Sequence, residues 1–252
     1  MHYEVLGRGR PVIFVHGWLG SWRYWIPTMQ ALSAEYRTYA LDLWGFGDTS
    51  KAAARYHLDA QADLLQRFMD QMGILKAAFV GHGLGGLAVM RCARRFPEWI
   101  DRAMAVSVPL HAGAISQRLA AGAPGTLVEW LLGRDPAAEP IRQEAAKADP
   151  LALAATLEGE AMPSTRVDLA EVRVPCLLVY GERDPAIAPP EATALAGLNG
   201  RVHSLGLEES RHFPMLDEAA KFNRLLADFL SLKPGEDLQN LNLKEEWRRR
   251  VR

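Results

Sequence analysis

The chain has 252 residues, of which 49% are hydrophobic and 23% are charged, and these are ordinary values for one globular domain with a sizeable core. Its formal net charge of −1 excludes the broad positive field that nucleic-acid binding needs. No apolar run approaches the roughly 18 residues that span a bilayer. The N-terminal residues lack the features of a signal peptide, and Cys92 and Cys176 lie in apolar stretches, so we expect a cytoplasmic protein with two buried thiols.

Short apolar runs alternate with longer amphipathic segments in the first half of the chain. The first 17 residues predict a strand, a turn and a second strand that includes residues 12–15. The elements expected next are a helix at 22–34, a strand at 36–43, a helix at 58–72, a strand at 77–80, a helix at 84–96 and a strand at 103–108. This βαβα alternation predicts an α/β fold with a doubly wound, mostly parallel sheet, whose functional loops follow the C-terminal ends of the strands.

The alternation stops after the strand at 103–108. Residues 110–167 are rich in alanine, glycine and proline and show only short helical pieces, at 126–132 and 141–147. A segment this long without strands inside a compact domain indicates a functional insertion. The expected elements that follow are a strand at 176–180, a helix near 190–196, a strand at 201–207 and a final helix at 215–232.

These elements predict a core formed by residues 1–109 and 168–232, a helical cap at 110–167 and a C-terminal extension at 233–252. The extension ends in EEWRRRVR, a short basic run with one tryptophan. Two interpretations stay open for it, a solvated tail and a helix that binds a membrane surface or a partner.

The first motif, FVHGWLGSW, follows the strand at 12–15. Gly17 allows the backbone to turn sharply, so that the amide of Trp18 can point into a site. Such an amide is one half of an oxyanion hole, which stabilises charge as it develops on a substrate oxygen. The same residues are also compatible with an ordinary turn that ends a strand and has no catalytic role.

The second motif, ALDLWGFGDTS, contains an acidic residue directly after a strand. Asp42 has the chemistry of a catalytic acid, but Gly45 and Gly47 close behind it indicate a tight loop. We therefore expect Asp42 to brace this loop.

The third motif, AAFVGHGLGGLAVM, runs from a strand through a glycine-rich turn straight into a helix. Strand, sharp turn and helix are the context of a nucleophile elbow, and the amide of Leu84 would complete the oxyanion hole. The residue at the tip of this elbow is Gly83.

The fourth motif is split between CLLVYGERDP and ESRHFPMLDE. Asp184 follows one buried strand, and His212 follows the next strand and precedes the last helix. An acid and a histidine that both follow strand ends can meet across a site, where the acid orients the imidazole as a base.

In this order and across nearly the whole chain, the segments FVHGW, DLWGFGDTS, VGHGLGG, VYGERDP and RHFPMLDE resemble the successive signatures of the α/β-hydrolase superfamily. The resemblance is to small bacterial esterases, lactonases, haloperoxidase-like enzymes and carbon–carbon bond hydrolases with a helical cap. It implies an acid at Asp184, a base at His212, oxyanion-hole amides at Trp18 and Leu84, and a nucleophile at position 83.

Position 83 departs from this pattern, because glycine has no atom that could form an acyl-enzyme. No neighbour replaces the missing hydroxyl: His82 should point away from the elbow, Ser107 ends a different strand, and Cys92 lies further along the helix. Glycine adopts the strained elbow conformation freely, so we expect an intact fold. We also expect a small polar void between His212 and the two oxyanion-hole amides, in which a water could sit.

Three hypotheses follow from these residues. The first is a serine hydrolase of carboxylic esters or similar acyl substrates in which an introduced glycine replaces the serine nucleophile. Such a protein would be inactive or would trap its substrate. The second is a natural non-catalytic protein that binds a small molecule or a partner. The third is an enzyme without a covalent intermediate, in which the Asp184–His212 pair acts as a general base.

The ligand that these motifs imply is a small, hydrophobic, ester-like molecule in a pocket with Trp22, His82 and Phe213 as walls. We expect no metal, because the histidines and carboxylates lack ligand spacing, and no cofactor, because the glycine-rich turn has no lysine behind it for phosphate. No nucleic-acid partner is expected.

Overall fold

The computed structural model describes residues 1–132, 138–157, 161–196, 198, 200–233, 236 and 238–241. The extension predicted at 233–252 therefore lies almost wholly outside the described residues, including its tryptophan and arginines. No helix in the described part of the chain is both long enough and apolar enough to cross a bilayer.

A seven-stranded sheet forms the centre of the fold, in the order β1-β3-β2-β4-β5-β6-β7. Only β1 pairs antiparallel, with β3, and all the other pairs are parallel. The strands are β1 (Tyr3–Gly7), β2 (Arg10–Val15), β3 (Tyr36–Leu41), β4 (Ala77–His82), β5 (Ile100–Val106), β6 (Cys176–Gly181) and β7 (Val202–Leu207). The predicted α/β class and mostly parallel, doubly wound sheet are confirmed.

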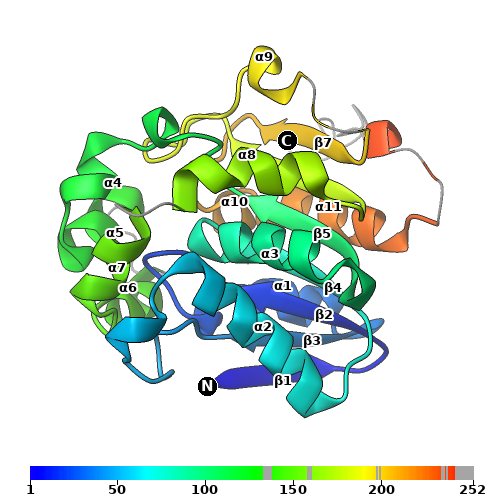
Figure 1. Cartoon of the computed structure of the whole chain (residues 1–252), viewed down its shortest axis with the longest axis horizontal. Coiled ribbons are helices and arrows are strands. Elements are labelled where there is room, and N and C mark those ends of the chain that lie inside the picture. The colour runs from blue at the N-terminus through cyan, green and yellow to red at the C-terminus, as the bar shows by residue number, and fades with distance from the viewer. Residues whose placement is uncertain are drawn as a thin grey trace.

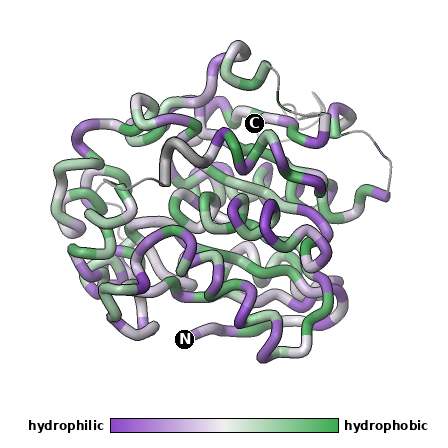
Figure 2. Tube along the Cα trace, in the orientation of Figure 1, coloured by the Kyte–Doolittle hydropathy of each residue, from purple (hydrophilic) through white to green (hydrophobic). Residues whose placement is uncertain are grey.

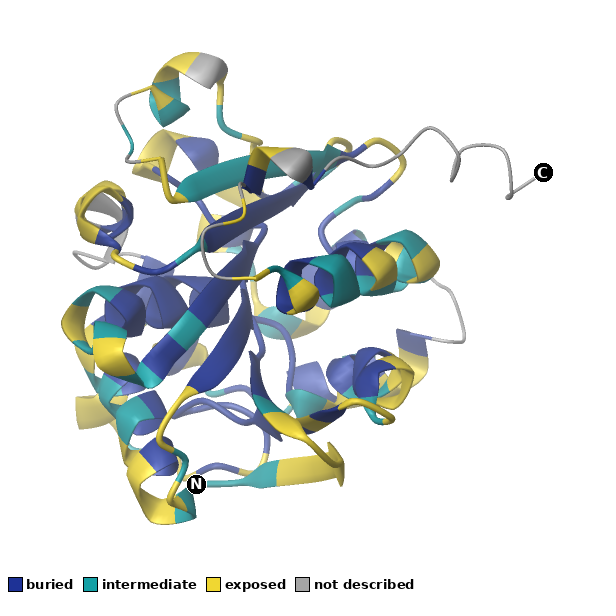
Figure 3. Cartoon of the chain, turned by 90° about the vertical axis from the view of Figure 1, so that its right-hand side faces the viewer, coloured by how far each residue is buried: buried dark blue, intermediate teal, exposed yellow. Residues whose placement is uncertain are grey.

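Helices cover both faces of this sheet. Figure 1 shows α2 (Leu58–Met72), α3 (Leu84–Arg95) and α8 (Ala161–Glu171) side by side over one face, and α1 (Ile26–Leu32) and α11 (Ala219–Ser231) pack together over the other. Strands β4 and β6 are buried along their whole length, whereas exposed residues lie on the outer sides of the helices and on the edge strand β1 (Figures 2 and 3). Continuous burial explains why strands such as β4 have no alternating sequence pattern.

Two predicted helices are interrupted in the structure. The segment 22–34 begins as a 3-10 turn, Trp22–Trp25, and becomes α-helical only at Ile26, because Pro27 lacks an amide hydrogen and fits the first helical turn. The segment 215–232 divides into α10 (Pro214–Asp217) and α11 at Glu218. The carboxylate of Glu218 accepts hydrogen bonds from the Ser210 hydroxyl at 2.7 Å and from the Glu209 amide at 3.1 Å, which ties this residue to the preceding loop.

The insertion between β5 and β6 is helical in its described part. It contains α4 (Gln117–Ala121), α5 (Pro124–Leu132), α6 (Glu139–Ala145) and α7 (Pro150–Leu157), gathered at one end of the sheet in Figure 1, and then α8. Position 167, the predicted end of the cap, lies inside α8, which packs on α3 and so belongs to the layers of the core.

An ion-pair cluster holds α8 on α3. The side chain of Asp168 is 1% exposed and pairs with Arg91 Nε at 2.9 Å and with Arg94 Nε at 2.7 Å. Burial raises the pKa of Asp168, although the two guanidinium groups oppose that change. Removing one partner from a buried pair leaves charge without compensation.

We expect Asp168→Asn to lower the free energy of unfolding by about 3 kcal/mol in urea denaturation, because two arginines lose their shared carboxylate. Asp63→Asn is the matched control, since Asp63 pairs with Arg95 at 2.8 Å but is 41% exposed. Its loss should stay below about 1 kcal/mol. Equal losses in the two variants would show that the buried cluster does not hold α8.

Candidate active site

Loops at the C-terminal ends of four strands meet at one edge of the sheet, as the motifs predict. They are the turn after β2 with Trp18, the elbow after β4 with Gly83, the loop after β6 with Asp184 and the loop after β7 with His212. In parallel sheets this edge is the usual place for a ligand site.

Asp184 and His212 form a hydrogen-bonded pair. His212 Nδ1 lies 2.8 Å from Asp184 Oδ2, and the other carboxylate oxygen accepts the amides of Ala186 at 2.7 Å and Ile187 at 3.1 Å. Burial alone would raise the pKa of Asp184, but His212 and the two amides outweigh it and hold the pKa below its ordinary value. The ionised carboxylate therefore accepts a hydrogen bond from Nδ1–H, which leaves Nε2 of His212 as the basic nitrogen.

Gly83 occupies the conformation of a nucleophile elbow. Its φ of 48° and ψ of −116° place it in a region that residues with a side chain rarely adopt, between the end of β4 and the start of α3. Its amide donates to Val106 O at 2.8 Å, so the turn is fixed to the neighbouring strand. Sequence analysis therefore predicts the elbow correctly, and the structure keeps its backbone without a nucleophilic side chain.

The indole of Trp18 packs against the tip of the elbow. A Cβ built on Gly83 would lie 3.0 Å from both Cε3 and Cζ3 of Trp18, so the ring occupies the space into which a side chain at position 83 would project. The Trp18 side chain is 1% exposed, and its Nε1 donates to Thr156 Oγ1 of α7 at 2.9 Å, so the insertion holds this ring. The polar void expected between His212 and the two amides stays a prediction.

The predicted oxyanion-hole amide of Leu84 follows Gly83 directly in the chain, and that of Trp18 follows Gly17, whose Cα lies 3.6 Å from a Cβ built on Gly83. Neither N–H has a hydrogen-bond partner among the described residues. The Leu84 amide is the first of helix α3, where N–H groups have no partner within the helix. An oxyanion-hole role for these two amides stays a prediction.

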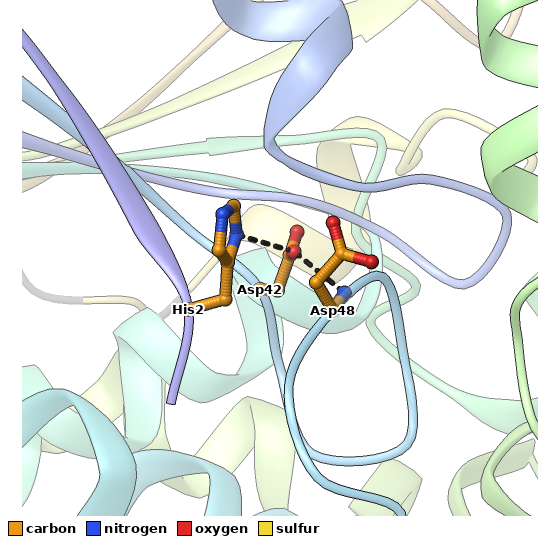
Figure 4. Close-up of side chains that lie close together, drawn as sticks. All are labelled: His2, Asp42 and Asp48. Carbon is orange, nitrogen blue, oxygen red and sulfur yellow. Dashed lines mark hydrogen bonds and ion pairs between the residues drawn. The ribbon is translucent and has the colours of Figure 1, made fainter.

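Asp42 braces the loop in which it lies, as its sequence context predicts. Its Oδ1 accepts the amide of Trp22 at 2.9 Å, and its Oδ2 accepts the amide of Asp48 at 3.0 Å and lies 2.9 Å from His2 Nδ1. Figure 4 shows His2, Asp42 and Asp48 close together, near enough for their ligand atoms to share one metal ion. Because N–H groups already occupy both oxygens of Asp42, we assign this cluster to bracing the N-terminus and the loop.

The three residues predicted to line a pocket are not gathered in one place. Phe213 and His82 are buried against the His212 ring, with centroid distances of 5.1 Å and 4.7 Å. Both ring nitrogens of His82 have protein partners. Trp22 instead lies against His2 and under the guanidinium of Arg23. A role for these residues in lining a pocket stays a prediction.

The sequence analysis misses Thr156 and Tyr24, which touch residues of the site, and gives no role to Ser107. Thr156 holds Trp18 from a stretch of α7 that shows no motif, and Tyr24 contacts Gly17 and His82 from a run of aromatic residues. Ser107 is excluded as a nucleophile in the sequence analysis, but its φ of 50° is unusual for a residue with a side chain, and its hydroxyl donates to His212 O at 3.3 Å. Only an alignment of relatives could have marked them.

This combination of a doubly wound sheet, an elbow and an acid–histidine pair defines a hydrolase-type α/β protein. The pattern of the family described as alpha/beta hydrolase fold matches residues 10–149, and the chain belongs to that family. The chain is similar to the pimeloyl-[acyl-carrier protein] methyl ester esterase of Vibrio cholerae, with 25% identity over 91% of this chain and 97% of the relative.

Solved structures show the same fold. A hydrolase from Pseudomonas aeruginosa superposes with a TM-score of 0.80 at 19% identity, covering 91% of this chain and 94% of the other. A serine-to-glycine mutant of an N-acyl homoserine lactonase, complexed with N-hexanoyl homoserine lactone, superposes with a TM-score of 0.77 at 23% identity, covering 90% and 92%.

Proposed function

We propose that the chain binds a small, hydrophobic ester or lactone at the site around Gly83 and forms no acyl-enzyme there. The observation that carries this proposal is the elbow itself, which has the backbone angles of a nucleophile position and no side chain. Nucleophilic catalysis needs an oxygen, sulfur or nitrogen at this point, and glycine offers none.

The binding chemistry follows from the groups around the elbow. A carbonyl oxygen of the ligand would accept the free amides of Trp18 and Leu84, and Nε2 of His212 would face the same carbonyl group. The surrounding side chains Trp18 and Phe213 are apolar and buried, which favours a hydrophobic ligand. The lactone complex of the serine-to-glycine lactonase supports this proposal, since an intact lactone is held in that mutant of the same fold.

Helices α4 to α7 act as the cap in this proposal. Polar contacts that fasten this segment to the loops of the site include Thr156 to Trp18 at 2.9 Å, Arg23 to Glu144 at 2.8 Å, Lys147 to Asp48 at 3.1 Å, Arg211 to Trp130 O at 3.2 Å and the Asp149 amide to Gly45 O at 2.8 Å. A ligand that reaches both amides has to displace the Trp18 indole, so binding and a shift of α7 should occur together.

A second function is favoured by the Asp184–His212 pair, which is complete without a nucleophile. His212 Nε2 has no hydrogen-bond partner among the described residues. In this alternative His212 takes a proton from water as the water attacks the ligand carbonyl, with no covalent intermediate.

The test compares the present chain with Gly83→Ser, using a fluorophosphonate probe, p-nitrophenyl butyrate and intact-protein mass spectrometry. We expect the serine variant to gain the mass of the probe at position 83 and to hydrolyse the ester, because the base and the amides are in place. The present chain should gain no mass but should bind N-hexanoyl homoserine lactone or the ester in ligand-observed NMR.

Each part of the proposal can fail separately in this test. A covalent adduct on the present chain that maps to the site would overturn the absence of acyl transfer. Failure of the present chain to bind either small molecule would overturn the binding function.

A further inference from the structure

A buried chain of hydrogen bonds connects the turn after β2 to the loop that carries His212. The amide of Gly17 donates to Tyr24 Oη at 2.6 Å, Tyr24 Oη lies 3.0 Å from His82 Nδ1, and His82 Nε2 lies 2.9 Å from the backbone oxygen of His212. Tyr24, His82 and His212 are each 3% exposed or less. Water therefore does not compete for these contacts.

The direction of each hydrogen bond in this chain is fixed. The Gly17 amide can only donate, so Tyr24 Oη accepts from it and gives its own hydrogen to His82 Nδ1. His82 then carries its proton on Nε2 and donates to the His212 carbonyl, which can only accept. Burial lowers the pKa of His82 well below its ordinary value, so the ring stays neutral and keeps this tautomer.

Close packing surrounds the same residues. A Cβ on Gly17 would lie 2.8 Å from His82 Nδ1, so the turn approaches the ring as nearly as glycine allows. The His82 ring packs on His212 at 4.7 Å and on Tyr24 at 5.7 Å between centroids. Ser107 Oγ donates to the same His212 oxygen at 3.3 Å, so this carbonyl is held from two strands.

These contacts act on the two halves of the site. Gly17 immediately precedes Trp18, whose amide is one proposed oxyanion donor, and the His212 carbonyl belongs to the residue that supplies the base. Asp184 fixes the rotation of the His212 ring but not the position of its backbone. Catalytic and binding groups must be held to within fractions of an ångström, and the residues behind them do this.

We propose that Tyr24 and His82 are positioning residues that fix the Trp18 amide and the His212 imidazole relative to each other. Neither residue touches the ligand in this inference; each acts through the backbone of a neighbour. The inference rests on the function proposed for the site at Gly83, and its test reads the protein without any ligand.

The experiment compares Tyr24→Phe with Tyr180→Phe in the chain as it stands. Tyr180 is the matched control, because it is also buried and its hydroxyl donates to a backbone oxygen, that of Val108, at 2.9 Å. Both variants keep the aromatic ring and lose one hydroxyl. The readouts are amide hydrogen exchange at Gly17 and the low-field proton resonance expected for His212 Nδ1–H, which donates its hydrogen bond to Asp184.

We expect Tyr24→Phe to speed exchange at Gly17 at least about tenfold and to broaden or shift the His212 resonance, although no hydrogen bond joins Tyr24 to His212. Tyr180→Phe should leave both readouts unchanged at a similar loss of thermal stability. If Tyr24→Phe speeds exchange at Gly17 but leaves the His212 resonance as it was, the chain does not couple the two loops and the inference is wrong.

Two conservative variants of His82 separate the ends of the chain. His82→Gln keeps a donor near the position of Nε2 and should preserve the His212 resonance, whereas His82→Asn keeps only a group near Nδ1 and should lose it. The same resonance in both variants would contradict a positioning role. If the present chain binds no ligand but the variants show the expected changes in the His212 resonance, the proposed function is rejected and the positioning inference stands.

Discussion

Replacing Trp18 with phenylalanine is expected to raise the rate at which the Gly83→Ser variant reacts with a fluorophosphonate by at least about tenfold. The reason is the 3.0 Å contact between the six-membered ring of the Trp18 indole and a Cβ built at position 83. A serine side chain and the indole compete for one space, so the hydroxyl cannot reach its working position until the ring yields. Trp18→Phe removes both contacting carbon atoms, and relief of about 1.4 kcal/mol corresponds to a tenfold gain in rate.

Stability should show the same competition. Gly83→Ser alone should cost about 1–3 kcal/mol of unfolding free energy, because a side chain is forced into the backbone conformation at φ 48°. Trp18→Phe alone should also destabilise, since it leaves a gap beside Gly83. The loss of unfolding free energy in the double variant should be smaller than the sum of the two single-variant losses by roughly 0.5–3 kcal/mol, the range seen for residues in contact. Urea denaturation of the four chains measures this coupling.

Trp25→Phe is the control for this pair of predictions. Trp25 is also fully buried, but it packs on Phe14 and Phe222 in the core, and not on the elbow. It should neither raise labelling of the Gly83→Ser variant nor couple to it in stability. If the fluorophosphonate labels Gly83→Ser as fast as it labels the Gly83→Ser, Trp18→Phe double variant, the indole does not obstruct the site.

The predicted helices and strands agree with the structure where a local sequence pattern determines where an element begins and ends. The helix predicted at 58–72 matches α2 at both ends, because apolar residues repeat at helical spacing and Gly73, at φ 63°, ends it. The positions of Asp184, His212 and the turn at Gly83 could be placed together because each follows the end of a parallel strand, and parallel strands bring such ends to one edge of the sheet. Helix starts at Ile26 and Ala219 were missed, because Pro27 and the side-chain contacts of Glu218 act against a continuous apolar pattern.

The occupant of the site could not be predicted in the same way. The sequence places the Trp18 backbone amide after a strand, but the direction of the indole depends on Thr156, which is 138 residues away in the chain. The missing side chain of Gly83 leaves room beside the elbow, and close packing brings in a neighbour that no motif marks. The chain from Gly17 to His212 depends likewise on contacts between three loops that no spacing reveals.

Loss of the base is expected to have the largest negative effect. In the Gly83→Ser, Trp18→Phe background, His212→Gln should lower kcat/KM for p-nitrophenyl butyrate on the order of 10³-fold, because the serine hydroxyl loses the group that takes its proton. Asp184→Asn should approach the same loss, since an amide no longer holds the His212 proton on Nδ1. His111→Gln, at an exposed histidine, is the control and should leave kcat/KM unchanged.

The same substitution in the chain that keeps Gly83 decides between the two proposed functions. If the present chain hydrolyses the ester slowly, is not labelled by the fluorophosphonate, and loses its activity with His212→Gln, then His212 acts as a general base on water and the second function is correct. If the present chain binds the ester and His212→Gln changes only the dissociation constant, the site binds without turnover. If His212→Gln leaves the rate of ester hydrolysis unchanged, neither function uses the acid–histidine pair, although its hydrogen bond of 2.8 Å is fully formed.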